Sequence, residues 1–203
     1  MHFEILLAFC FSSLILTLSP GPDIIYVATQ GLTKGRKEAL LVSFGLTTGL
    51  IFHTILVVSG FSFLVKENET LFNILKFFGA GYFIYLAFQT FFKREKDLEI
   101  KIDKKINYNY FKRGLIMNLL NPKVSLFFIA LFPGFIFHDQ FSVEIQFFIL
   151  GLIFWFQATI IFILVSIFSS KSSFLNRSYT LKSKTYVLEI LIYIFFAVWI
   201  LKP

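Results

Sequence analysis

Two charged residues that stand beside helix-breaking prolines are the strongest candidates for chemistry in this sequence. Asp23 ends the run Ser-Pro-Gly-Pro-Asp, and Lys123 ends the run Asn-Pro-Lys about a hundred residues later. Each run interrupts a long apolar stretch. A proline inside a helix costs roughly 3 kcal/mol, and a charge at mid-membrane depth adds roughly 2.5–3.5 kcal/mol. A chain that carries both costs at matching places is predicted to use them for function.

The chemistry that these residues offer is recognition of a zwitterion. A break in a membrane helix points a helix N-terminus into the protein, and that end favours a carboxylate. Lys123 adds a full positive charge, whereas the carboxylate of Asp23 suits an ammonium group or a proton. The residues predicted to bind substrate are Asp23, Asn121 and Lys123, and those predicted to shape the site are Pro20, Gly21, Pro22 and Pro122. The alternative interpretation is that Asp23 caps a half-helix and pairs with Lys123 without touching any ligand.

His53 is a further candidate, either as a pore-lining residue or as a buried hydrogen-bonding one. It follows Gly49 by one helical turn and therefore lies on the same face. Gly45 and Gly49 form a GxxxG pattern, which permits close approach of a neighbouring helix.

The elements that position these residues are predicted to be membrane spans. The 203-residue chain is 57% hydrophobic and 15% charged, with a mean hydropathy of +0.76, whereas a soluble domain is about 25% charged. Thirty Phe residues among so few charges exclude a soluble globule of this size. We predict an all-α membrane protein with six spans, at residues 5–28, 39–65, 71–92, 114–137, 145–169 and 186–201.

The basic residues alternate between the loops that join these spans. Fifteen of the nineteen Lys and Arg residues fall between spans one and two, three and four, or five and six. This is the positive-inside pattern, so those loops are predicted to be cytoplasmic and both termini extracytoplasmic. The same distribution speaks against nucleic-acid binding, despite the net charge of +7.

The six spans divide into two halves of three. Residues 1–92 form the first half, residues 93–113 a cytoplasmic linker, and residues 114–203 the second half of a single transmembrane domain. Because three is odd, the second half enters the membrane from the opposite face, as in an inverted repeat. Span four starts either at Gly114, or nearer Tyr108 if Lys112 and Arg113 reach back to the interface.

Two other function classes find little support in the residues. A membrane enzyme needs a nucleophile with a base, or paired acids, yet no second carboxylate accompanies Asp23. A site for a divalent metal needs several carboxylates, histidines or thiols, and the spans offer too few. We therefore expect no metal and no cofactor. A transporter of another small solute or of a metal ion, or a membrane-embedded enzyme, stays an alternative.

The motifs resemble those of the LysE/RhtB (lysine exporter/threonine-homoserine exporter) superfamily of bacterial inner-membrane proteins. The resemblance covers most of the chain. The motifs that carry it are Pro20-Gly21-Pro22-Asp23, the basic loop Gln30–Lys37, Gly45, Gly49 and Gly60, the stretch Leu75–Ala87, the stretch Phe111–Lys123, and Phe132-Pro133-Gly134-Phe135. The chain departs from the family pattern in the sixth span, which contains no glycine.

The resemblance implies a function that the residues alone do not define. It implies export of amino acids or their derivatives across the bacterial inner membrane, driven by proton antiport. It also implies a six-span fold and a homodimer. The expected partners are therefore an amino acid, protons, the lipid bilayer and a second copy of the chain.

Overall fold

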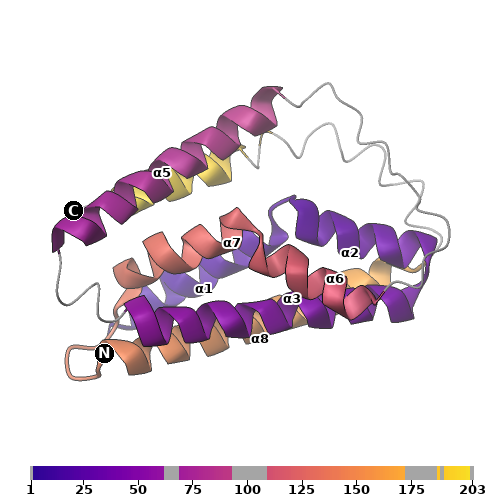
Figure 1. Ribbon diagram of the computed structural model, residues 1–203, viewed down its shortest axis with the longest axis horizontal. Helices are drawn as coiled ribbons and strands as arrows, with labels where there is room; N and C mark the ends of the chain where they lie inside the picture. The colour runs from indigo at the N-terminus through magenta and orange to yellow at the C-terminus, as the bar shows by residue number, and fades with distance from the viewer. Residues whose placement is uncertain (1, 62–68, 93–108, 172–186, 188–189, 202–203) are drawn as a thin grey trace.

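The computed structural model describes residues 2–61, 69–92, 109–171, 187 and 190–201, and the described secondary structure is entirely helical. Most helices run along the long axis of the molecule (Figure 1). In chain order they are α1 (Phe3–Leu18), α2 (Pro22–Thr33), α3 (Arg36–Leu56), η1 (Val57–Phe61), α5 (Glu69–Phe92), α6 (Tyr110–Leu119), α7 (Pro122–Leu126), η3 (Phe127–Leu131), η4 (Phe132–Phe135) and α8 (Val143–Ser169). A C-terminal helix, Ile190–Ile200, follows.

Both predicted breaks are sharp bends in the structure. The axis turns by 53° between α1 and α2, and by 46° between α6 and the helical segment Pro122–Phe135. Pro22 and Pro122 each occupy the first turn of the helix that follows the bend, where a missing backbone N–H leaves no hydrogen bond unmade. The two bent pairs run in opposite directions along the long axis (Figure 1).

The lengths and composition of the helices suit a membrane. The continuous helices Arg36–Gly60 and Val143–Ser169 are each long and apolar enough to cross one, and each bent pair passes the same test when it is counted as one span. These findings confirm a helical protein with apolar, span-length elements, while the count of six spans stays a prediction. The fourth predicted span begins four residues before Gly114. Helix α6 starts at Tyr110 because the Asn109 side chain accepts a hydrogen bond from the Lys112 amide at 3.0 Å and caps it.

Glycines bring α3 and α6 into backbone contact, as the GxxxG pattern predicts. A Cβ atom added at Gly45 would lie 2.1 Å from the Phe111 carbonyl oxygen, and one at Gly114 would lie 2.2 Å from the Val42 carbonyl oxygen. At Gly49 it would lie 2.4 Å from the Asn118 side-chain oxygen. Only hydrogen fits at these positions, so the glycines hold the end of α6 directly against α3.

The core next to the second break is built from phenylalanine on irregular helix. After α7 the chain continues as the π-helix η3 and the 3₁₀-helix η4. Phe9 of α1 packs edge-on against Phe132 and Phe135, each with 5.3 Å between ring centroids, and Phe127 packs against Phe154 of α8 at 5.2 Å. These five rings are buried and fill the half of the molecule that contains α1 and the start of α8 (Figure 1).

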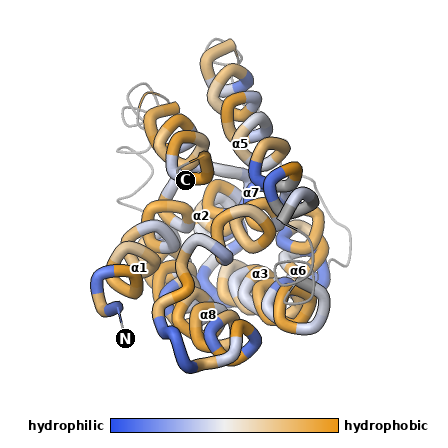
Figure 2. Tube along the Cα trace, turned by 90° about the vertical axis from the view of Figure 1, so that its left-hand side faces the viewer, coloured by the Kyte–Doolittle hydropathy of each residue, from blue (hydrophilic) through white to orange (hydrophobic). Residues whose placement is uncertain are grey.

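The two ends of the long axis differ in charge. Lys34, Arg36, Lys37, Lys112, Arg113 and Lys171 lie at the end where α2 ends and α3 begins, here called the basic end. Helix α1 begins and the C-terminal helix ends at the opposite end (Figure 1). At that opposite end the hydrophilic residues gather at the start of α1 and in the loop before α8, while the helices between are mostly apolar (Figure 2).

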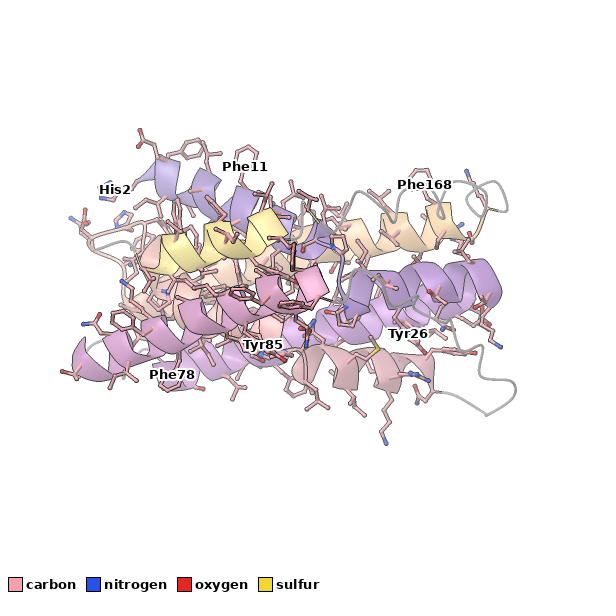
Figure 3. The ribbon with its side chains drawn as sticks, turned by 90° about the horizontal axis from the view of Figure 1, so that it is seen from above. His2, Phe11, Tyr26, Phe78, Tyr85 and Phe168 are labelled. Carbon is pink, nitrogen blue, oxygen red and sulfur yellow. The ribbon has the colours of Figure 1, made fainter. Side chains whose placement is uncertain are left out.

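Large apolar side chains cover the outer surface. Phe11, Phe78 and Phe168 point away from the bundle (Figure 3) and are 63%, 72% and 53% exposed. Exposing so many large apolar side chains to water would be unfavourable, whereas exposing them to lipid is not. Helix α5 and the C-terminal helix lie side by side along one edge (Figure 1), joined by Phe83, which packs against Tyr193 and Phe196.

Candidate functional site

Asn121 links the two breaks by hydrogen bonds in both directions. Its side-chain oxygen accepts from the Lys123 amide at 3.0 Å and so caps α7, while its Nδ2 donates to Oδ2 of Asp23 at 2.6 Å. An asparagine satisfies both partners because one side needs an acceptor and the other a donor. The structure therefore brings together Asp23 and Asn121, which are 98 residues apart in sequence.

Lys123 reaches back to the first break. Its Nζ donates to the backbone carbonyl oxygen of Ser19 at 3.2 Å, an acceptor left outside the regular helix where α1 ends. The Nζ also lies 5.9 Å from the centre of the Tyr193 ring on the C-terminal helix. Asp23, Asn121 and Lys123 are 8%, 6% and 7% exposed, so two groups of opposite charge are held together inside the protein.

A small cavity of about 30 Å³ opens between the breaks. Its polar wall comes from the end of α1, both breaks and the start of α2, and its apolar wall mainly from α8 and α3. The lining residues are Leu16, Thr17, Ser19, Gly21, Asp23, Ile24, Leu50, Asn121, Lys123, Phe154, Ala158 and Phe162. This volume is enough to admit water.

Two buried polar atoms of the cavity wall have no hydrogen-bond partner within the described part of the chain. They are Oγ of Ser19 and Oδ1 of Asp23. Leaving a buried polar atom unpaired costs about 1–3 kcal/mol. Both residues line the cavity, so a ligand or water that reached these two atoms would supply the missing hydrogen bonds.

Of the predicted shaping residues, Pro20, Pro22 and Pro122 are not among those that line this cavity. Gly21 lines it, and a Cβ atom added there would lie 3.5 Å from Lys123 Nζ. Pro20 and Pro22 flank Gly21 in the chain, and Pro122 separates Asn121 from Lys123. The glycine thus leaves the ammonium group of Lys123 accessible from the cavity.

His53 lies apart from the cavity lining. It is 7% exposed, its ring stacks on Phe128 with 5.4 Å between centroids, and Nε2 lies 3.3 Å from the Asn118 carbonyl oxygen. Because a carbonyl only accepts hydrogen bonds, Nε2 is the nitrogen that carries the proton. His53 of α3 therefore lies against Asn118 near the end of α6, three residues before Asn121, and its role in lining a pore stays a prediction.

Sequence reasoning missed several residues of the site. Ser19 is the first residue of the run that forms the first break. Its hydroxyl was not predicted to belong to the site, because nothing in the sequence distinguishes it from other serines. Phe154, Ala158 and Phe162 come from α8, which is apolar throughout and has no motif. Tyr193 carries no spacing that links it to Lys123. Within the described ranges, no three His, Cys, Asp or Glu side chains gather where they could hold a metal ion.

The comparison with protein families identifies this arrangement. The family model of the LysE type translocator matches residues 14–202, which include both breaks and the whole cavity lining. This chain belongs to the LysE type translocator family.

Two relatives of this translocator carry curated names. The homoserine/homoserine lactone efflux proteins of Salmonella typhimurium and Salmonella typhi are each 37% identical to it over 152 residues, covering 74% of this chain and 73% of the relative. No solved structure matches the translocator.

Proposed function

We propose that this translocator exports amino acids or close derivatives from the cytoplasm, and that the substrate binds in the cavity between the two breaks. Asp23 binds the ammonium group, Lys123 binds the carboxyl group, and Asn121 holds the two halves of the site in register. Family membership and the efflux relatives support export.

The observation that carries the proposal is the pairing of opposite charges across one buried cavity. Asp23 lines the cavity, and its Oδ1 has no hydrogen-bond partner in the described part of the chain. Lys123 lines the same cavity, and its Nζ lies 3.5 Å from the position of a Cβ atom added at Gly21. An α-amino acid carries the complementary pair of charges about one carbon apart. Burial makes both interactions stronger than they would be in water.

The names of the relatives narrow the chemistry further. Homoserine and its lactone share an α-ammonium group and an acyl oxygen, whereas only homoserine has a carboxylate. A site that pairs Asp23 with the ammonium group and Lys123 with the acyl oxygen accepts both molecules. We expect the same two contacts in this chain, with Asp23 as the charge that every substrate requires.

Binding requires the site to open. The cavity of about 30 Å³ holds water but no amino acid. A substrate carboxyl group replaces the Ser19 carbonyl as the partner of Lys123, and the bend between α1 and α2 widens as that bond is released. The exchange of an internal partner for a substrate partner links binding to movement of the broken helices.

The topology that fits this cycle has six spans in two inverted repeats. The bends of 53° and 46°, and the opposite directions of the two bent pairs, support it (Figure 1). The break lies about 18 Å from the basic end along the 12-residue helix α2 and about 15 Å from it along the 10-residue helix α6. Both breaks therefore lie near the middle of a hydrocarbon core about 30 Å thick. We place the basic end in the cytoplasm and both termini outside the inner membrane.

Asp23 is also the proposed carrier of the coupling proton. Among the described residues it is the carboxylate that lines the cavity, and its Oδ1 accepts no hydrogen bond from the described part of the chain, so this oxygen can carry a proton. A proton entering from outside displaces the substrate ammonium group, since Asp23 holds one or the other. Because Asp23 also binds the ammonium group, the Asp23→Asn variant is expected to lose both amino-acid exchange at equal pH and accumulation driven by a pH gradient.

Export from cells tests the proposed site. Cells that express the protein are loaded with mixed dipeptides, and the amino acids released outside are measured for wild type, Lys123→Ala and the control Lys37→Ala. Lys37 is exposed at the basic end and lies outside the cavity. We expect export by wild type and Lys37→Ala, and loss of export in Lys123→Ala at equal protein level. Equal export by all three would refute the site, and no export by wild type would refute the function.

A further inference from the structure

The apolar wall of the cavity has one small residue between two large ones. Phe154, Ala158 and Phe162 all line the cavity, and residues four apart lie on one face of a helix. The two phenyl groups are about 12 Å apart along α8. Ala158 contributes only a methyl group to the wall between them, and this lower part of the wall is here called the notch.

Both flanking positions are fixed by contacts outside the cavity. The Phe154 ring packs against Phe127 at 5.2 Å and against Phe128 at 5.5 Å between centroids. The carbonyl oxygen of Phe162 accepts hydrogen bonds from Ser43 at 3.3 Å and from Ser166 at 2.8 Å. These contacts restrain the two sides of the notch, so its depth depends on the side chain at position 158.

The charges of the opposite wall set the orientation of an amino acid in the cavity. The unpartnered atoms Ser19 Oγ and Asp23 Oδ1, with Lys123, all belong to the broken helices. The ammonium and carboxyl groups must face this wall, since no charged residue lines the α8 side of the cavity. The side chain of the substrate then points at α8.

We propose that Ala158 is a specificity-determining residue, and that the notch it forms receives the side chain of the substrate and limits its length. The inference rests on the proposed function. The substrate class is α-amino acids and their esters with a short, unbranched side chain. A larger residue at position 158 fills the notch, and glycine deepens it.

A homologous series of substrates tests this inference. The full-length protein is reconstituted in liposomes, and KM and maximal rate are measured for glycine, alanine, 2-aminobutyrate, norvaline and norleucine, with homoserine as reference. Consecutive members differ by one methylene, which a binding pocket discriminates by about 10-fold or more. The variants are Ala158→Val, Ala158→Gly and the control Ala39→Gly, whose alanine is fully buried in α3 and does not line the cavity.

If Ala158 limits the length of the substrate side chain, substitutions there should change the ratios of rate over KM between substrates. Ala158→Val should lose at least about 10-fold in rate over KM for the longer members relative to glycine, Ala158→Gly should shift the preference toward longer members, and Ala39→Gly should keep the wild-type order. A uniform loss for all substrates, or unchanged ratios in Ala158→Gly, overturns it, and Ala158→Gly decides alone if Ala158→Val does not fold. Transport of homoserine but of no other member by wild type also overturns it. If wild type carries neither homoserine nor the series, the proposed function itself is wrong.

Discussion

The hydrogen bond between Asn121 and Asp23 is the connection that makes one site from two distant breaks, and Asn121→Asp removes it with minimal change of shape. Asp caps a helix as well as Asn does, so the bond to the Lys123 amide remains. The 2.6 Å contact with Asp23 becomes a contact between two carboxyl groups. A hydrogen bond to a charged group contributes about 1.5–3 kcal/mol, so at least this much stability should be lost.

Thermal unfolding of the purified protein in detergent measures this loss. For a chain of this size each kcal/mol shifts Tm by about 2–4 °C, so we expect Asn121→Asp to unfold about 3–12 °C below wild type. The double variant Asp23→Asn with Asn121→Asp places the amide and the carboxylate on opposite partners. It should recover much of the lost Tm, because the donor and acceptor face each other again.

The double variant also tests whether the side chains of Asn121 and Asp23 interact. Its coupling energy, measured as the departure from additivity of the two single variants, should reach at least about 1.5 kcal/mol. Additive losses would mean that the two side chains do not interact, and an Asn121→Asp variant as stable as wild type would mean that Asn121 serves only as a cap. Either result would mean that the Asn121–Asp23 hydrogen bond does not hold the two breaks together. The proposed site depends on that bond.

Three further predictions follow from single contacts. Gly45→Ala places a Cβ 2.1 Å from a backbone oxygen of α6 and should cost about 1–3 kcal/mol in thermal unfolding, whereas Gly81→Ala, which meets no described atom within 4 Å, should not. Gln146 makes four hydrogen bonds to the backbone of the loop after η4. Gln146→Leu should therefore speed the hydrogen exchange of the amides in that loop. Unchanged exchange would mean that these bonds do not hold the loop. Gly21→Ala should keep Tm, because φ is −161°, but should raise the KM for export, because its methyl lies 3.5 Å from Lys123 Nζ.

Much of the fold was predictable because its causes are local. Composition alone indicates a membrane protein, and Pro22 and Pro122 predict the bends because a proline disrupts a helix wherever it stands. The glycines Gly45 and Gly49 predict a close contact for a similar reason. The start of α6 was less certain from sequence, since the charges of Lys112 and Arg113 argued for a later start, while the cap at Asn109 decided for an earlier one.

The candidate site was predictable in part. Asp23, Asn121 and Lys123 are conspicuous since charged or amide groups beside prolines are unusual in apolar sequence, and the structure gathers all three around one cavity. Ser19, Ala158 and their neighbours could not be found in this way. A serine or an alanine acquires a role here only from what lies across the cavity from it.

The sequence by itself therefore determined the class of protein, the positions of both breaks and the charged and amide residues beside them. These depend on the cost of prolines and charges in an apolar helix, which is a property of each segment alone. Only the tertiary structure decided that the Asn121 amide bonds Asp23, that Lys123 bonds the end of α1, that His53 lies beside the cavity lining rather than in it, and that α8 forms the opposite wall. Those facts depend on which helices pack together, and in a chain of uniformly apolar spans the packing is set by shape rather than by any pattern of polarity along the sequence.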